Sequence, residues 1–127
     1  MRLEQICFNG IEFIYAISNV KKEFYRSVNE AWKDSPPWER YQKKLMQDLA
    51  VLEQEKERAI DLPQFEKLNG SDRLYSIRHP ESKKNVRIIY TFLDDKIFLL
   101  TAFLEKTDGD YQKAMATARK RLRWLEN

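Results

Sequence analysis

Cationic and phenolic side chains stand at the ends of apolar segments in the second half of this 127-residue chain. Arg78 and His79 close one apolar segment, Arg87 opens the next, and Lys106 and Tyr111 follow a third. If the three segments form one antiparallel sheet, we expect these groups to converge. Fixed cations stabilise the negative charge that develops on a phosphodiester under attack, so such a cluster is suited to RNA.

The first 60 residues predict a strand hairpin followed by a helical hairpin. Residues 11–17 alternate with the period of a strand, and Asn9-Gly10 is a typical tight turn that would pair residues 3–8 with 11–17. Helical periodicity then runs from a cap at Ser18 or Asn19 to near Asp34. After Ser35-Pro36-Pro37 a second helix begins, with an aromatic stripe that is either a docking surface or, as is usual at this spacing, part of the core.

The second half predicts three strands and a final helix. Residues 74–78 form one strand, with Arg78 on the face away from the core. Residues 86–93 and 97–104 are apolar on both faces, as interior strands are, and Asp94-Asp95 joins them. The last helix is capped by Asp108 or Asp110.

The expected order is therefore β-α-α-β-β-β-α. This is an α+β fold with an antiparallel, mixed-edge sheet, an N-terminal helical hairpin and a C-terminal helix.

Composition narrows the class of protein. With 127 residues and 43% hydrophobic content, residues 1–127 are expected to form a single domain. The sequence has no apolar run of roughly 20 residues and no signal segment, so a cytoplasmic protein is expected. A single cysteine, Cys7, and a single histidine cannot supply a disulfide or a zinc quartet, and we expect no metal and no small-molecule cofactor.

Positive charge is concentrated in the second half. Residues 1–70 hold 11 basic and 12 acidic side chains, whereas residues 71–127 hold 12 and 8. An anionic partner is consistent with this distribution, and Lys83, Lys84, Lys113, Arg119 and Lys120 are the candidate RNA-binding residues. Alternatively, the basic residues of the last helix only complement its dipole and keep the surface soluble.

The order and spacing of several short segments resemble the RelE/ParE toxin superfamily, and most of all its HigB-like, phage-derived Gp49-like branch. The similarity covers about residues 63–122, and the first 60 residues match only in layout. The segments are Phe65-Glu66-Lys67-Leu68-Asn69-Gly70, Leu74-Tyr75-Ser76-Ile77-Arg78, Val86-Arg87-Ile88-Ile89-Tyr90, Leu99-Leu100-Thr101-Ala102-Phe103 and Lys106-Thr107.

This resemblance implies the toxin of a bacterial type II toxin-antitoxin system, with a cognate antitoxin, the ribosome and mRNA as partners. It implies a ribosome-dependent endoribonuclease that cleaves mRNA through the ribose 2′-hydroxyl without a metal and so inhibits translation. Arg78 and Lys106 align with basic strand residues of the family's active site. Arg87 aligns with the arginine that contacts the scissile phosphate, and Tyr111 with the tyrosine that stacks on a substrate base.

Two positions depart from the family pattern. Ser76 and Glu105 stand where basic residues are common, and the loop residues Lys83 and Lys84 are possible substitutes. His79 or Glu105 are candidate general acids or bases. However, we expect Glu105 to pair with Arg87 or Lys106, which would make an ordinary ion-pair network.

Each candidate residue also has a structural interpretation. Arg87 can be an interior residue satisfied by a carboxylate, Arg78 a surface residue, and Tyr111 an anchor between the last helix and the sheet. Two other functions therefore stay open. One is a ParE-like inhibitor of DNA gyrase that is not a nuclease, and the other is a non-enzymatic phage-derived binding protein.

Overall fold

The chain folds as an α+β protein with a mixed sheet, and the computed structural model describes residues 1–7, 10–70, 73–78 and 84–127. In chain order the elements are β1 (Leu3–Gln5), β2 (Ile14–Ile17), α1 (Asn19–Ala31), α2 (Trp38–Glu55), the 3-10 helix η1 (Lys56–Asp61), β3 (Phe65–Lys67), β4 (Tyr75–Arg78), β5 (Val86–Leu93), β6 (Lys96–Leu104) and α3 (Asp108–Glu126). None of the helices in the described part of the chain is long and apolar enough to cross a membrane.

The six strands form one sheet in the order β1-β2-β6-β5-β4-β3. Strand β2 runs parallel to β6, and the other neighbours are antiparallel. The two strands that were predicted to be interior, β5 and β6, lie in the middle, where both faces are covered. Their connection at Asp94-Asp95 has positive φ at both residues (53° and 62°), which is a type I′ hairpin turn built without glycine.

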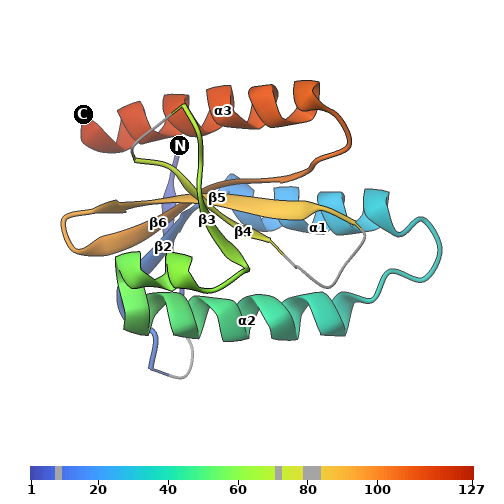
Figure 1. The fold of residues 1–127 in the computed structure, drawn as a ribbon, viewed down its shortest axis with the longest axis horizontal. Coiled ribbons are helices and arrows are strands. Elements are labelled where there is room, and N and C mark those ends of the chain that lie inside the picture. Colours follow the sequence, from blue (N-terminus) through green and yellow to red (C-terminus); the bar gives the residue numbers. More distant parts are fainter. Residues whose placement is uncertain (8–9, 71–72, 79–83) are drawn as a thin grey trace.

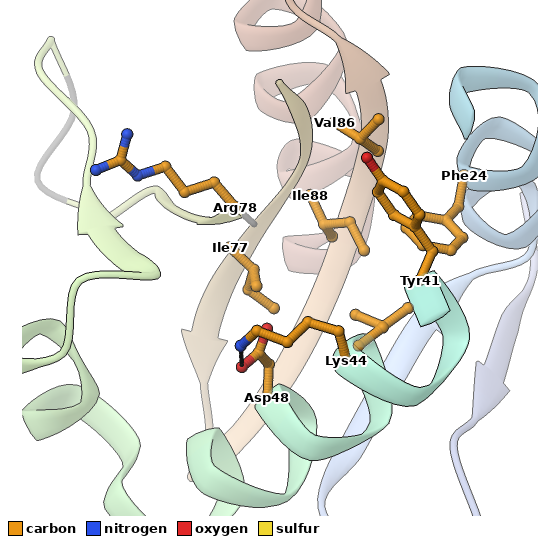
Figure 2. Close-up of a pocket in the computed structure, with 9 residues that line it drawn as sticks. Phe24, Tyr41, Lys44, Asp48, Ile77, Arg78, Val86 and Ile88 are labelled. Atoms are coloured by element: carbon orange, nitrogen blue, oxygen red, sulfur yellow. Dashed lines mark hydrogen bonds and ion pairs between the residues drawn. The ribbon is translucent and has the colours of Figure 1, made fainter. Parts of the chain in front are cut away.

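Helices cover both faces of the sheet (Figure 1). Helix α3 lies on one face and α2 on the other. Helix α1 packs against β6, and its Phe24 meets Tyr41 of α2 with ring centroids 6.5 Å apart. These two rings line a small cavity of about 20 Å³ together with Ile77 of β4 and Ile88 of β5 (Figure 2). This cavity is too small for a ligand.

The N-terminal hairpin differs from its prediction. A two-residue turn at Asn9-Gly10 would place Leu3 opposite Ala16, but Leu3 pairs with Ile17, and the ladder ends at Gln5. Asn9 itself lies outside the described residues. The segment before β2 is instead held to α2, because the backbone N–H groups of Glu12 and Phe13 donate to the Glu53 carboxylate at 2.8–3.0 Å.

The order of elements also contains more strands than predicted. Both strands of the hairpin were predicted, although the predicted order counts the hairpin once, and β3 is an additional edge strand of three residues that pairs with β4. Helix α1 ends at Ala31 instead of Asp34, and the Ser18 side chain makes no capping hydrogen bond. Helix α3 is capped by Thr107, and Asp110, one of the two predicted caps, completes a capping box with it.

Candidate active site

Arg87 lies near the start of β5 between β4 and β6, and only 7% of its surface is exposed. Its guanidinium donates to Glu105 (Nη1–Oε1 2.9 Å), Ser76 (Nη2–Oγ 2.7 Å) and Glu66 (Nη2–Oε2 3.3 Å). The predicted pairing of Glu105 with Arg87 is therefore confirmed. A buried cation needs such partners, because removal from water costs several kcal/mol when it is not compensated.

Three elements supply these acceptors. Glu66 of β3 is the register partner of Ser76 of β4, so the two side chains share a face. Glu105 follows β6, and its backbone N–H donates to the Asn85 carbonyl, which continues the β5–β6 pairing by one step. The Asn85 side-chain amide donates to the Glu105 carboxylate as well. Glu105 is therefore fixed, whereas Glu66 is held by its bond to Arg87.

The two carboxylates differ in their exposure to water. The Glu105 side chain is 22% exposed and the Glu66 side chain 47%. The Glu66–Arg87 pair is also the longer of the two, at 3.3 Å against 2.9 Å. Exposed ion pairs contribute roughly 0–1 kcal/mol because water and salt screen them. An incoming anion can therefore replace Glu66 at the guanidinium more easily than it can replace Glu105.

Tyr111 is brought to Arg87 by the first turn of α3. The Arg87 guanidinium carbon lies 5.8 Å from the centre of the Tyr111 ring, within the range of a cation–π contact. The turn is fixed because the Asp110 carboxylate accepts from the backbone N–H groups of Lys106 and Thr107 at 2.9 and 3.0 Å. The Tyr111 hydroxyl donates to the Asn69 carbonyl at 3.4 Å. Tyr111 thus anchors the helix, as its structural interpretation states, and also lies beside the buried cation.

Arg78 is the register partner of Arg87 in the β4–β5 ladder. Directly paired residues of an antiparallel ladder point to the same face, so both arginines lie on the face that α3 covers. Arg78 is exposed, and Figure 2 shows its side chain extending away from the cavity that Ile77 lines. The structure therefore places an exposed cation next to the buried one. The face was predicted to point away from the core, but α3 covers it and Ser76 on the same face is buried.

Lys106 follows Glu105 but is directed to a different partner. Its ammonium is bonded to the Glu30 carboxylate of α1. The hydrogen bond and the charge of Glu30 raise the pKa of Lys106 above its ordinary value. Of the four predicted catalytic residues, Arg87 and Tyr111 are in contact and Arg78 is adjacent in the ladder, whereas Lys106 is paired with α1.

The residues predicted to bind RNA lie in two places. Lys113, Arg119 and Lys120 are exposed on α3, and Arg119 is near the Gly70 carbonyl at 3.5 Å. Lys84 lies against Trp32, with its ammonium 5.9 Å from the ring centre. His79 and Lys83 lie outside the described residues.

Sequence reasoning gave no role to two residues of this region, Glu66 and Trp32. Glu66 belongs to a strand of three residues, which is too short to show a period of two. The signal that could have found it is the Asn69-Gly70 turn, which is typical of a hairpin and so predicts a strand before the turn as well as after it. Trp32 follows the last residue of α1, and nothing local predicts that Lys84 lies against it.

No group of three or more His, Cys, Asp or Glu side chains in the described ranges is arranged to hold a metal ion.

The fold and this cluster define a small α+β protein whose central strands carry a carboxylate-bound arginine beneath the first turn of the C-terminal helix. Residues 19–123 match the model of one protein family, described as phage derived protein Gp49-like (DUF891). The chain belongs to this Gp49-like family. No curated protein and no solved structure matches the chain.

Proposed function

We propose that this Gp49-like protein is the toxin of a type II toxin-antitoxin system and that it cleaves mRNA on the ribosome without a metal. Three observations support the proposal: the family match, the resemblance to RelE- and HigB-like toxins, and the cluster around Arg87. The cluster is the observation that carries it. One arginine meets two carboxylates and an aromatic ring, with a second, exposed arginine beside it.

The proposed reaction is an intramolecular transesterification, in which a ribose 2′-hydroxyl attacks the phosphate that the same ribose carries at its 3′-oxygen. A base removes the 2′-hydroxyl proton, the 2′-oxygen bonds to phosphorus, and the bond from phosphorus to the 5′-oxygen breaks. The 5′-oxygen takes up a proton, so the products are a 2′,3′-cyclic phosphate and a 5′-hydroxyl. The enzyme must supply a base, a cation for the phosphorane and a proton donor.

Glu66 is our candidate for the base, because its carboxylate is half-exposed and adjoins the Arg87 guanidinium. Arg87 and Arg78 are the candidates for stabilising the phosphorane, since guanidinium groups bind phosphate oxygens in pairs. Tyr111 offers a ring on which a base can stack. His79, directly after Arg78 in the sequence, is the proposed proton donor.

Exposed cations on α3 and beside the cluster are the proposed binding sites for the partners. Exposed Lys113, Arg119 and Lys120 on α3 are suited to ribosomal RNA, and such binding weakens with salt. The antitoxin is expected to insert acidic groups at Arg78 and to cover apolar surface.

The test is tightly controlled expression in bacteria with mapping of transcript 5′ ends. The parent is expected to arrest translation and to produce ends in phase with codons. Glu66→Gln and Arg78→Ala, both at exposed positions, are each expected to lower cleavage by about 10²-fold or more, the usual contribution of a positioned base and of a group that stabilises developing charge. Arg58→Ala is the matched control, because the Arg58 side chain is 80% exposed in η1.

A ParE-like gyrase inhibitor is the second candidate, and one observation favours it. Arg87 is already paired with Glu66 and Glu105, and Lys106 with Glu30, so less positive charge is available to a phosphate. This function predicts a DNA-damage response, growth arrest by every variant and no new mRNA ends. A non-enzymatic binding protein predicts no growth defect.

A further inference from the structure

A groove of about 730 Å³ lies beside the candidate active site, at the end of α1. Its lining comes from the end of α1 and the residues after it, from the residues before β5 and from the end of β6. Glu105 belongs both to this lining and to the Arg87 cluster. The groove and the Arg87 cluster therefore adjoin at Glu105.

Trp32 provides an oriented aromatic surface in this groove. Its indole Nε1–H donates to the Tyr41 hydroxyl at 3.0 Å, which fixes the orientation of the half-buried ring. Two exposed cations approach the ring: the Arg40 guanidinium carbon lies 5.8 Å and the Lys84 ammonium 5.9 Å from its centre. A fixed ring between long cationic side chains is the combination that single-strand-binding proteins use for a base and its flanking phosphates.

The charge of the groove is mixed. Lys33, Lys84 and Lys106 face Glu30, Asp34 and Glu105 in the lining. Two of these acids are compensated, because Glu30 is paired with Lys106 and Glu105 with the buried Arg87. Arg40 adds positive charge and Asp110 negative charge at the margin. The four basic and four acidic groups balance, so recognition in this groove depends more on stacking than on charge.

We infer that this groove is a nucleotide-binding subsite for single-stranded RNA, in which a base stacks on Trp32 and Arg40 and Lys84 contact the phosphates on either side. The inference rests on the proposed function, because the subsite would hold the nucleotide next to the cleaved bond. A base that stacks on the indole displaces the end of one cationic side chain from the ring. Both cations are long and flexible enough to turn to a phosphate instead.

The experiment measures RNA binding separately from cleavage. An unstructured 2′-O-methyl RNA octamer has no 2′-hydroxyl to react, and it is titrated into the full chain while tryptophan fluorescence is followed. We expect quenching in the parent and about five- to 100-fold weaker binding by Trp32→Leu, the loss that corresponds to one base–aromatic stack. Trp124→Leu is the matched control, because Trp124 is 37% exposed at the far end of α3.

Charge gives a second readout. If two phosphates are contacted, the logarithm of the binding constant falls with the logarithm of salt concentration with a slope of about −1.4 for a single strand. Lys84→Ala and Arg40→Ala are each expected to lower this slope by about half. Circular dichroism of each variant shows whether the fold is retained.

Equal affinity of Trp32→Leu and Trp124→Leu for the octamer would overturn the subsite. Quenching by an acidic peptide at the same concentration would also overturn it and would assign the groove to a protein partner. Failure of the proposed function has a different signature. Expression would then produce no mRNA ends, while the Trp32-dependent RNA binding in the purified chain would persist.

Discussion

The ion pair between Glu23 of α1 and Arg121 of α3 is expected to be among the strongest single contributions to stability outside the apolar core. Strand β2 pairs with β6 only as far as Leu99, so the edge of β6 beyond that residue has no strand partner. Glu23 accepts from the Ala102 backbone N–H at 3.3 Å, and Arg121 donates to the Leu100 carbonyl at 2.7 Å. The pair thus supplies hydrogen-bond partners to the backbone of β6 beyond the end of its pairing with β2.

The geometry sets the size of the effect. The two side chains form a bidentate pair at 2.9 and 2.8 Å and are only 19% and 12% exposed. Removing one partner of a buried pair costs about 3–5 kcal/mol, and the lower end applies to this partly exposed pair. We therefore expect Glu23→Met to lower the free energy of unfolding by about 3 kcal/mol, or the melting temperature by about 12 °C.

Arg121→Met should cost less, about 2 kcal/mol, because Glu23 keeps the Thr101 hydroxyl at 3.0 Å as a donor. The stability lost in the double variant should be smaller, by about 1–2 kcal/mol, than the sum of the losses in the two single variants. Urea unfolding of the parent, both single variants and the double variant measures this coupling. Additive losses, within about 0.5 kcal/mol, would refute the reasoning. The exposed pair Arg58–Glu55 is the control, and its removal should change stability little.

Three further predictions concern single positions. Tyr90→Phe should leave the free energy of unfolding unchanged or raise it by about 1 kcal/mol, measured by thermal unfolding. The buried Tyr90 hydroxyl has no hydrogen-bond partner among the described residues, and burial raises its pKa. A loss of more than about 1 kcal/mol would reveal a partner. Asp95→Gly should raise the free energy of unfolding by roughly 0.5–1 kcal/mol, seen as a higher urea midpoint. Glycine adopts the positive φ of the β5–β6 turn without strain. Backbone N–H groups of Lys106 and Thr107 lower the pKa of Asp110, so its stabilising effect is complete above the ordinary Asp range and is lost as pH falls through the lowered pKa. Asp110→Asn should therefore unfold at a lower urea concentration than the parent at pH 7. A difference of the same size at pH 2 would contradict this.

The central strands could be predicted from the sequence because their signal is local. Residues of β5 and β6 are apolar on both faces, and such runs are typical of interior strands. The pairing of Glu105 with Arg87 could be predicted for a related reason: Glu105 follows one strand and Arg87 begins its neighbour, so a hairpin brings them together.

The rest of the site depends on contacts between distant segments. Glu66 reaches Arg87 only because β3 adds an edge to the sheet, and its three residues are too few to show a period. Lys106 turns to Glu30 because the end of α1 lies beside the end of β6, a contact across 76 positions of the sequence. The N-terminal hairpin pairs Leu3 with Ile17, one step from the predicted register, and the contact of the Glu12 and Phe13 backbone with Glu53 spans about 40 positions of the sequence.

The parallel pairing of β2 with β6 has a consequence for the order in which the protein can be built during synthesis. About 80 residues separate the two strands, and at about 5–20 residues per second the ribosome needs about 4–16 s to make them. Until β6 has emerged, α1 lacks the strand with which it makes most of its contacts, and the N-terminal hairpin has no sheet to join. A nascent chain that stops before Lys96 therefore cannot assemble the sheet around Arg87, and the complete cluster forms only after Glu105 and Tyr111 have also emerged.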